Sequence, residues 1–197
     1  MTKTRFQYFL FNKPYGVLAQ FTPAGGYRSL GDFGPFPGDV YPVGRLDADS
    51  EGLMLLTNDN RVNHRLTTPE FRHERTYLVQ IERVPTGESL LKLSDGVVIE
   101  HQRTRQCKVR LLEADPVLPP RPVPIRFRKN VPVCWLEITL TEGRNRQVRK
   151  MTAAVGHPTL RLVRTHIGNL SLDGLLPGES RILTGSEIED LRKSLGS

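Results

Sequence analysis

Proline and glycine divide this chain into short segments, and their placement limits the folds open to it. The 197 residues include 15 prolines and 17 glycines. Six of the prolines lie from Pro116 to Pro132, and three prolines with three glycines lie from Gly31 to Pro42. Because proline has no backbone N–H to donate, both stretches are predicted to be loops or turns. The regular elements must lie in the segments between them.

Those segments show two periodicities, which predict a mixture of strands and helices. Alternating or wholly apolar runs predict strands, and apolar residues spaced three or four apart behind a capping side chain predict helices. This mixture favours an α+β fold with a mostly antiparallel sheet. The predicted strands cover 6–13, 52–57, 76–81, 97–99, 107–112 and 135–140, and the predicted helices follow Asp59, Thr86 and Thr184 or span 145–155.

Length and composition indicate one soluble domain or two tightly joined subdomains. The longest interior apolar run is only Leu53–Leu56, so neither a membrane span nor a secretory peptide is expected. Two cysteines, Cys107 and Cys134, are too few for a disulfide framework or a four-ligand zinc site. The five histidines are scattered, so we expect no metal, and a reducing cytoplasm is the simplest setting.

Positive charge is concentrated in one part of the chain. The whole chain carries a net charge of +7, yet residues 101–168 hold 14 Lys and Arg against four acidic residues, a net of +10. Such an asymmetry is typical of a surface that binds the phosphate backbone of a nucleic acid, although a solvated basic face is the alternative. The cations are Arg103, Arg105, Lys108, Arg110, Arg121, Arg126, Arg128, Lys129, Arg144, Arg146, Arg149, Lys150, Arg161 and Arg164.

The stretch GRLDADSEGLMLLTND, residues 44–59, is the best candidate for chemistry. Arg45 and Asp47 bring opposite charges together just before an apolar strand. A carboxylate near a cation stays ionised, as a nucleophile must. From spacing alone a structural salt bridge is the commoner outcome, and Asp49, Glu51 and Asp59 compete for the role.

This stretch and four others resemble the pseudouridine synthases, in particular their RsuA-type branch. The other four are NKPYG (12–16), RTYLV (75–79), EGRNRQVRKM (142–151) and LRLVRTHIG (160–168). They occur in the family's order. Within that branch the chain is most similar to the RluE group, which modifies large-subunit ribosomal RNA.

The resemblance implies the pseudouridine synthase fold, a mostly antiparallel mixed sheet with flanking helices, in which two subdomains surround a central RNA-binding cleft. We expect residues 1–197 to form a single catalytic domain, without the small S4-like N-terminal module that many relatives carry. The implied reaction isomerises uridine to pseudouridine in RNA and needs no cofactor. It also implies that the target base is flipped out of its helix.

The resemblance also assigns roles to individual residues. Asp47 corresponds to the essential aspartate, and Tyr77 to the residue that stacks on the uracil. Arg149 is expected to pair with Asp47, and Arg45 to fill the space left by the flipped base. Leu162 is expected to wall the pocket, with Leu160 as a competitor. The residues expected to contact RNA are Arg144, Arg146, Lys150 and, in the proline-rich loop, Arg128.

Two other functions stay open at this point. One is a non-catalytic RNA-binding or ribosome-assembly protein with the same fold, and the other is a synthase acting on a different RNA. Without the resemblance, Tyr77 would be read as a core aromatic and the arginines as a basic helix face. The expected partner is ribosomal RNA, as a large-subunit stem-loop, and the expected state is a monomer.

Overall fold

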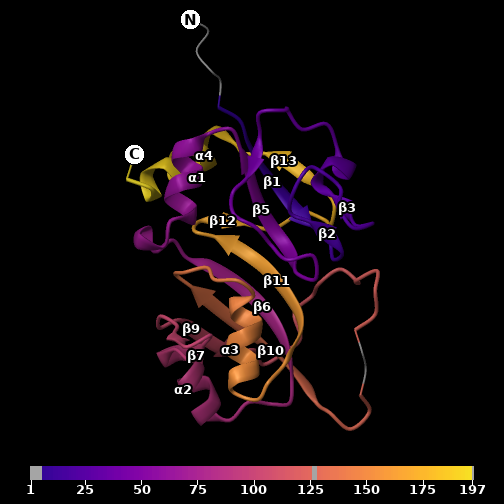
Figure 1. Cartoon of the computed structure of the whole chain (residues 1–197), viewed down its shortest axis with the longest axis vertical. Helices are drawn as coiled ribbons and strands as arrows, with labels where there is room; N and C mark the ends of the chain where they lie inside the picture. Colours follow the sequence, from indigo (N-terminus) through magenta and orange to yellow (C-terminus); the bar gives the residue numbers. More distant parts are fainter. Residues whose placement is uncertain (1–5, 126–127, 197) are drawn as a thin grey trace, which may run out of the picture.

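The structure is a computed structural model that describes residues 6–125 and 128–196. Arg126, one of the clustered cations, lies outside the described residues. Within them a nine-stranded sheet runs through the molecule (Figure 1). Its main path is β13 (Ser180–Ile182), β1 (Tyr8–Lys13), β5 (Glu51–Thr57), β11 (Thr159–Ile167), β6 (Arg75–Glu82), β10 (Val133–Leu140) and β9 (Lys108–Leu111), with β4 (Tyr41–Pro42) on β5 and β12 (Leu170–Ser171) on β11.

Two helices lie at each end of this sheet. Near β1 and β5 are α1 (Asn60–Thr67) and α4 (Gly185–Ser194), and near β9 and β10 are α2 (Gly87–Asp95) and α3 (Gln147–Ala154) (Figure 1). Two small pairings complete the described elements: β2 (Val17–Leu18) with β3 (Arg28–Ser29), and β7 (Val98–Ile99) with β8 (Gln102–Arg103). The predicted α+β class with a mostly antiparallel sheet is confirmed.

The pairing of β5 with β11 joins the two halves of the sheet. It is parallel and covers only two register pairs, Val163 with Glu51 and Arg164 with Gly52. The other pairings along the main path are antiparallel. This short parallel joint connects two antiparallel halves of the sheet.

Three clusters of buried apolar side chains make up the described core. One joins β1 and β5 to α1 and α4, including Leu10 and Leu191. A second joins β6, β10, α2 and α3, including Ile81 and Met151. Phe11 belongs to a third, formed with the segment between β2 and β5. Tyr77 packs against both the second and the third cluster, so it lies where the halves meet.

Helix starts agree with the capping residues in the sequence. The Asp59 carboxylate accepts hydrogen bonds from the first turn of α1, and Thr86 caps α2. Thr184 and Glu187 form the predicted capping box at α4. The third helix begins at Gln147 rather than Asn145, because Arg146 adopts a left-handed backbone conformation with φ of 51°.

The proline-rich stretches are largely loops, as predicted. Residues 31–42 nevertheless contain most of a short 3₁₀ helix, Leu30–Phe33, and the strand β4. The described part of the loop between β9 and β10 contacts the body of the protein at several points. Arg121 lies 4.1 Å over the Tyr15 ring, and Arg161 donates to the Pro119 carbonyl at 2.9 Å.

Within residues 6–125 and 128–196, none of the helices has the length and apolar character needed to cross a membrane.

Candidate active site

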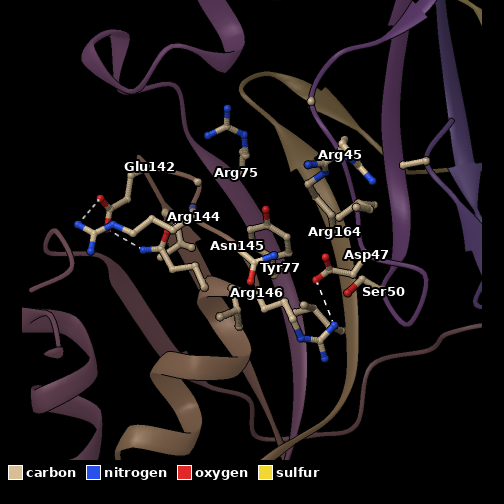
Figure 2. Close-up of a pocket in the computed structure, with 18 of the residues that line it drawn as sticks. Arg45, Asp47, Ser50, Arg75, Tyr77, Glu142, Arg144, Asn145, Arg146 and Arg164 are labelled. Carbon is tan, nitrogen blue, oxygen red and sulfur yellow. Dashed lines mark hydrogen bonds and ion pairs between the residues drawn. The ribbon is translucent and has the colours of Figure 1, made fainter. Parts of the chain in front are cut away.

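A cavity of about 700 Å³ opens beside the β5–β11 joint (Figure 2). Its walls come from segments far apart in the chain. Residues 43–50 form one wall, residues 142–148 face them, and β6 and β11 supply the floor. The volume lies within the usual range for small-molecule and nucleotide pockets.

The floor consists of side chains that alternate along two paired strands. Arg75 and Tyr77 are two apart on β6, and Leu162 and Arg164 are two apart on β11. Arg164 pairs with Tyr77 in the antiparallel register, and all four side chains line the cavity. Since alternate residues of a strand share a face, the strand pairing itself assembles this floor.

The segment that carries Asp47 is held from below by a buried lysine. The Lys13 ammonium donates to the carbonyls of Val17 at 2.7 Å, Pro14 at 2.9 Å and Ala48 at 3.4 Å. The Gly16 amide donates to the same Ala48 carbonyl at 2.7 Å. Burial lowers the pKa of Lys13 to about 8. These contacts fix the backbone beside Asp47.

Asp47 lies on the cavity wall, and its charge partner is Arg146. The two side chains are 3.6 Å apart, and about a third of the Asp47 side chain is exposed. The predicted pairing of Asp47 with Arg149 is wrong: Arg149 donates to the Asp49 carbonyl at 2.6 Å, and its Nε lies 3.5 Å from the Asp49 carboxylate. The reason is geometric, because α3 starts after Arg146 and turns Arg149 toward the backbone behind Asp47.

Asp49 links the two arginines. It accepts two hydrogen bonds from Arg146, at 3.0 and 2.8 Å. Burial by itself raises the pKa of Asp49, but the hydrogen bonds from Arg146 and the charge of Arg149 outweigh it and leave that pKa below its usual value. The same contacts raise the pKa of Arg146. The Asp49 carboxylate therefore stays ionised and holds Arg146 beside Asp47.

Other predicted site residues divide between the cavity and its surroundings. Arg45 is exposed and lines the cavity, and Leu162 lines it while Leu160 does not. Arg144 lines it too, with its guanidinium 3.2 Å from the Glu142 carboxylate and bonded to the Arg103 carbonyl.

Two of the predicted RNA contacts lie outside the cavity wall. Lys150 pairs with Glu100 at 2.6 Å and also donates to Asn145. Arg128 pairs with Glu82 at 3.2 Å. Both cations are therefore held by acidic neighbours outside the cavity lining.

Several residues that line the cavity were not predicted. Arg75 and Arg164 lie two residues from Tyr77 and Leu162, so strand alternation alone could have placed them on the same face. Buried Glu142 carries no such signal. It accepts from Gln147 at 2.7 Å and from the Arg105 amide at 2.9 Å, contacts that depend on the tertiary structure.

The carboxylates at this site are engaged by arginines. Within the described part of the chain, no group of three or more His, Cys, Asp and Glu side chains is arranged to hold a metal ion. The arrangement is one of a partly exposed carboxylate, a tyrosine and several guanidinium groups around a nucleotide-sized space. Such a set can bind an anionic polymer and present one carboxylate to it.

Similarity to known proteins agrees with this geometry. The ribosomal large subunit pseudouridine synthase E of Xanthomonas axonopodis pv. citri (strain 306) is 55% identical over 170 residues, covering 85% of this chain and 89% of the relative. The protein of that name in Vibrio parahaemolyticus serotype O3:K6 (strain RIMD 2210633) is 49% identical over 170 residues, covering 86% and 71%.

A solved structure is similar along nearly the whole chain. It is described as a crystal structure of pseudouridylate synthase, with a TM-score of 0.79 at 32% identity, covering 97% of this chain and 76% of that one. Residues 7–154 match the family described as RNA pseudouridylate synthase. With its cavity, its Asp47 segment and these relatives, this chain belongs to the RNA pseudouridylate synthase family.

Proposed function

We propose that this chain converts a specific uridine of large-subunit ribosomal RNA to pseudouridine, with Asp47 as the essential carboxylate. The relatives named as ribosomal large subunit pseudouridine synthases support the substrate. The observation that carries the role of Asp47 is its position on the wall of the cavity, 3.6 Å from Arg146 and facing a floor that includes Tyr77.

The reaction rearranges bonds within one nucleotide. The bond from ribose C1′ to uracil N1 breaks, the base turns, and C1′ bonds to ring carbon C5, which loses its hydrogen as a proton while a proton binds N1. Asp47 could attack C1′, attack the ring or take a ribose proton. Each route needs an ionised carboxylate, and Arg146 supplies the neighbouring positive charge.

The uridine must leave its helix to reach Asp47. Flipping a base costs about a few kcal/mol in lost stacking and pairing, which phosphate contacts offset. Arg45 is exposed at the cavity mouth and can occupy the vacated space. A guanidinium suits that position because it stacks and donates hydrogen bonds at once.

The flipped base would lie between Tyr77 and Leu162. Both side chains line the floor, and an aromatic ring with an aliphatic side chain can hold a planar base. Arg149 acts as a positioning residue, because it holds the Asp49 backbone and so the segment that carries Asp47. Lys150 and Arg128 would contact phosphates around the cavity, exchanging their acidic neighbours for the RNA backbone.

One chain is sufficient for this function in our proposal. Every side chain assigned a role comes from the same chain, so a monomer acting as one catalytic domain can carry out the reaction. A ribosomal RNA substrate makes the cytoplasm the expected compartment.

Release of tritium tests the proposal. Large-subunit ribosomal RNA transcripts labelled with tritium on uridine C5 are incubated with wild-type protein, with Asp47→Asn and with Asp190→Asn. Asp190 is exposed on α4, away from the cavity, and serves as the matched control. We expect release by the wild type and Asp190→Asn and none by Asp47→Asn.

Asp47→Asn should keep its fold and its RNA affinity. Arg146 retains both hydrogen bonds to Asp49, so its charge remains paired after the substitution. A binding assay and a thermal melt measure this directly. Tight binding without release by any of the proteins would support the non-catalytic RNA-binding function instead.

A further inference from the structure

Arg164 is a buried cation without an ionic partner among the described residues. Its relative exposure is 3%. Arg161, three residues earlier on β11, is also buried, but it makes two hydrogen bonds to the Glu51 carboxylate, at 3.0 and 2.7 Å. A charge taken out of water is costly unless it is paired. Arg161 is paired with Glu51 inside the protein. Arg164 has no such partner among the described residues, so a bound ligand would have to supply the negative charge.

One hydrogen bond fixes the Arg164 guanidinium in place. Its Nε donates to the Leu53 carbonyl at 2.7 Å, whereas Nη2 is buried and has no hydrogen-bond partner in the described structure. Buried donors are nearly always satisfied, so an unmatched one calls for an explanation. Arg164 lines the cavity together with Asp47 and Tyr77 (Figure 2). An acceptor atom on a ligand bound in that cavity would explain the unmatched donor.

A second, half-buried arginine adds to the positive charge of the floor. Arg75 donates to the Leu66 carbonyl, and its pKa is lowered by burial and by the charge of Arg164. Two like charges so close together are repelled until an anion lies near both. The floor is therefore built to receive negative charge.

Depth decides which part of the RNA can supply that charge. Arg45 and Arg146 are exposed at the cavity, where backbone phosphates arrive. Arg164 is on the floor and pairs in register with Tyr77, the residue assigned to the uracil ring. A phosphate stays at the surface of a flipped nucleotide, whereas the base enters the pocket.

We propose that Arg164, assisted by Arg75, binds a carbonyl oxygen of the flipped uracil and stabilises the negative charge that forms on the ring during the reaction. This assignment rests on the proposed function. When C1′–N1 breaks, the bonding electrons remain on the uracil and spread to O2 and O4. When a carboxylate adds to C6 instead, the ring electrons move to O4. Both routes place charge where a prearranged guanidinium can meet it.

Arg164→Gln and Arg164→Lys test the assignment in single-turnover tritium release at saturating RNA. The wild-type rate is measured first, so a failure of the proposed function, seen as no release from any RNA, is distinguished from a failure of this role. Loss of one prearranged donor of this kind slows a reaction by about 10²–10³-fold. We expect Arg164→Gln to lose that much and Arg164→Lys to lose less, with RNA affinity within about threefold of wild type.

Two results would overturn the role. One is a rate for Arg164→Gln close to that of the wild type. The other is a weakened RNA affinity with an unchanged rate at saturation, which would make Arg164 a phosphate contact. A thermal melt of each variant shows whether it is folded.

Sulfur substitution in the base gives a readout that a structural role would not change. The target uridine is replaced by 2-thiouridine or 4-thiouridine, because sulfur is a weaker hydrogen-bond acceptor than oxygen. We expect one substitution to slow the wild type and to have little further effect on Arg164→Gln, which has lost the guanidinium that binds the carbonyl oxygen. If Arg164→Gln does not fold, Arg164→Lys takes its place, and we expect the same substitution to slow it less than it slows the wild type. Equal slowing of both proteins, or no slowing of the wild type, would contradict the proposal.

Discussion

Gly52 occupies the point where β5 meets β11, and no larger residue fits there. A Cβ at this position would lie 2.3 Å from the Arg164 carbonyl oxygen and 2.7 Å from its nitrogen. The backbone φ of 105° also disfavours any residue with a side chain. The close approach of the two strands, and with it the position of Arg164 on the cavity floor, depends on the missing side chain.

Gly52→Ala should therefore destabilise the protein by about 2–5 kcal/mol, through backbone strain and overpacking together. Gly16→Ala is the matched control, because Gly16 also has a positive φ, of 78°, but a Cβ there would meet no atom within 4 Å. It should cost about 1 kcal/mol. Urea denaturation of both variants measures the difference, and equal losses would show that the contact with Arg164 does not matter.

Individual site residues could be predicted where the residue itself lies inside a motif that is recognisable in the sequence. Asp47 and Arg45 lie within a single stretch, and Tyr77 within another. The charge partner of Asp47 could not be predicted in this way. It depends on the left-handed backbone of Arg146, which decides whether Arg146 or Arg149 faces Asp47.

Among the elements, α4 has an N-terminus whose stability we expect to depend on pH. Glu187 closes the capping box with Thr184 and accepts two hydrogen bonds from Arg181, at 2.8 and 2.7 Å. The hydrogen bonds from Arg181 lower the pKa of Glu187 to about 2. A carboxyl group whose pKa is lower in the folded state stabilises that state above the unfolded pKa and loses this effect as pH falls toward the folded pKa.

Glu187→Gln should consequently lower the free energy of unfolding by about 1–2 kcal/mol at pH 7, a value reduced for the partial exposure of the pair. The difference from wild type should shrink between about pH 4.5 and pH 2. Chemical denaturation at pH 7, 4 and 3 follows this trend. A difference that stays constant with pH would assign the effect to the loss of packing.

The elements themselves could be predicted where their signals are local. Asp59, Thr86 and Thr184 cap their helices with atoms two or three residues away. The strand β11 could not be recognised, because its buried arginines break the apolar pattern expected of a central strand. Arg161 is compensated by Glu51, 110 residues away, and that contact is visible only in the folded chain.

For the whole molecule, the continuous sheet predicts a single unfolding transition. The halves share the β5–β11 joint, and Tyr77 packs into clusters on both sides. Trp135, the one tryptophan of the sequence, is buried on β10 and reports on one half. Hydrogen exchange of the amides of β1 and β5 reports on the other.

Both probes should give the same denaturation midpoint in wild type. Gly52→Ala weakens the β5–β11 joint, so a difference between the two midpoints should be easier to detect in this variant than in wild type. Two separate midpoints in wild type would instead reveal two subdomains that unfold on their own.

The order of the strands also governs when the site can exist during synthesis. Synthesis completes β5 at Thr57, but its neighbour β11 begins only at Thr159. On the other side of β5, β1 pairs with β13, which begins only at Ser180. Pairings between such distant segments close long loops and form slowly. The cavity floor is therefore among the last parts that a growing chain can build. Until β11 leaves the ribosome, the cavity lacks the part of its floor that Leu162 and Arg164 supply, and a nascent chain cannot yet act on RNA.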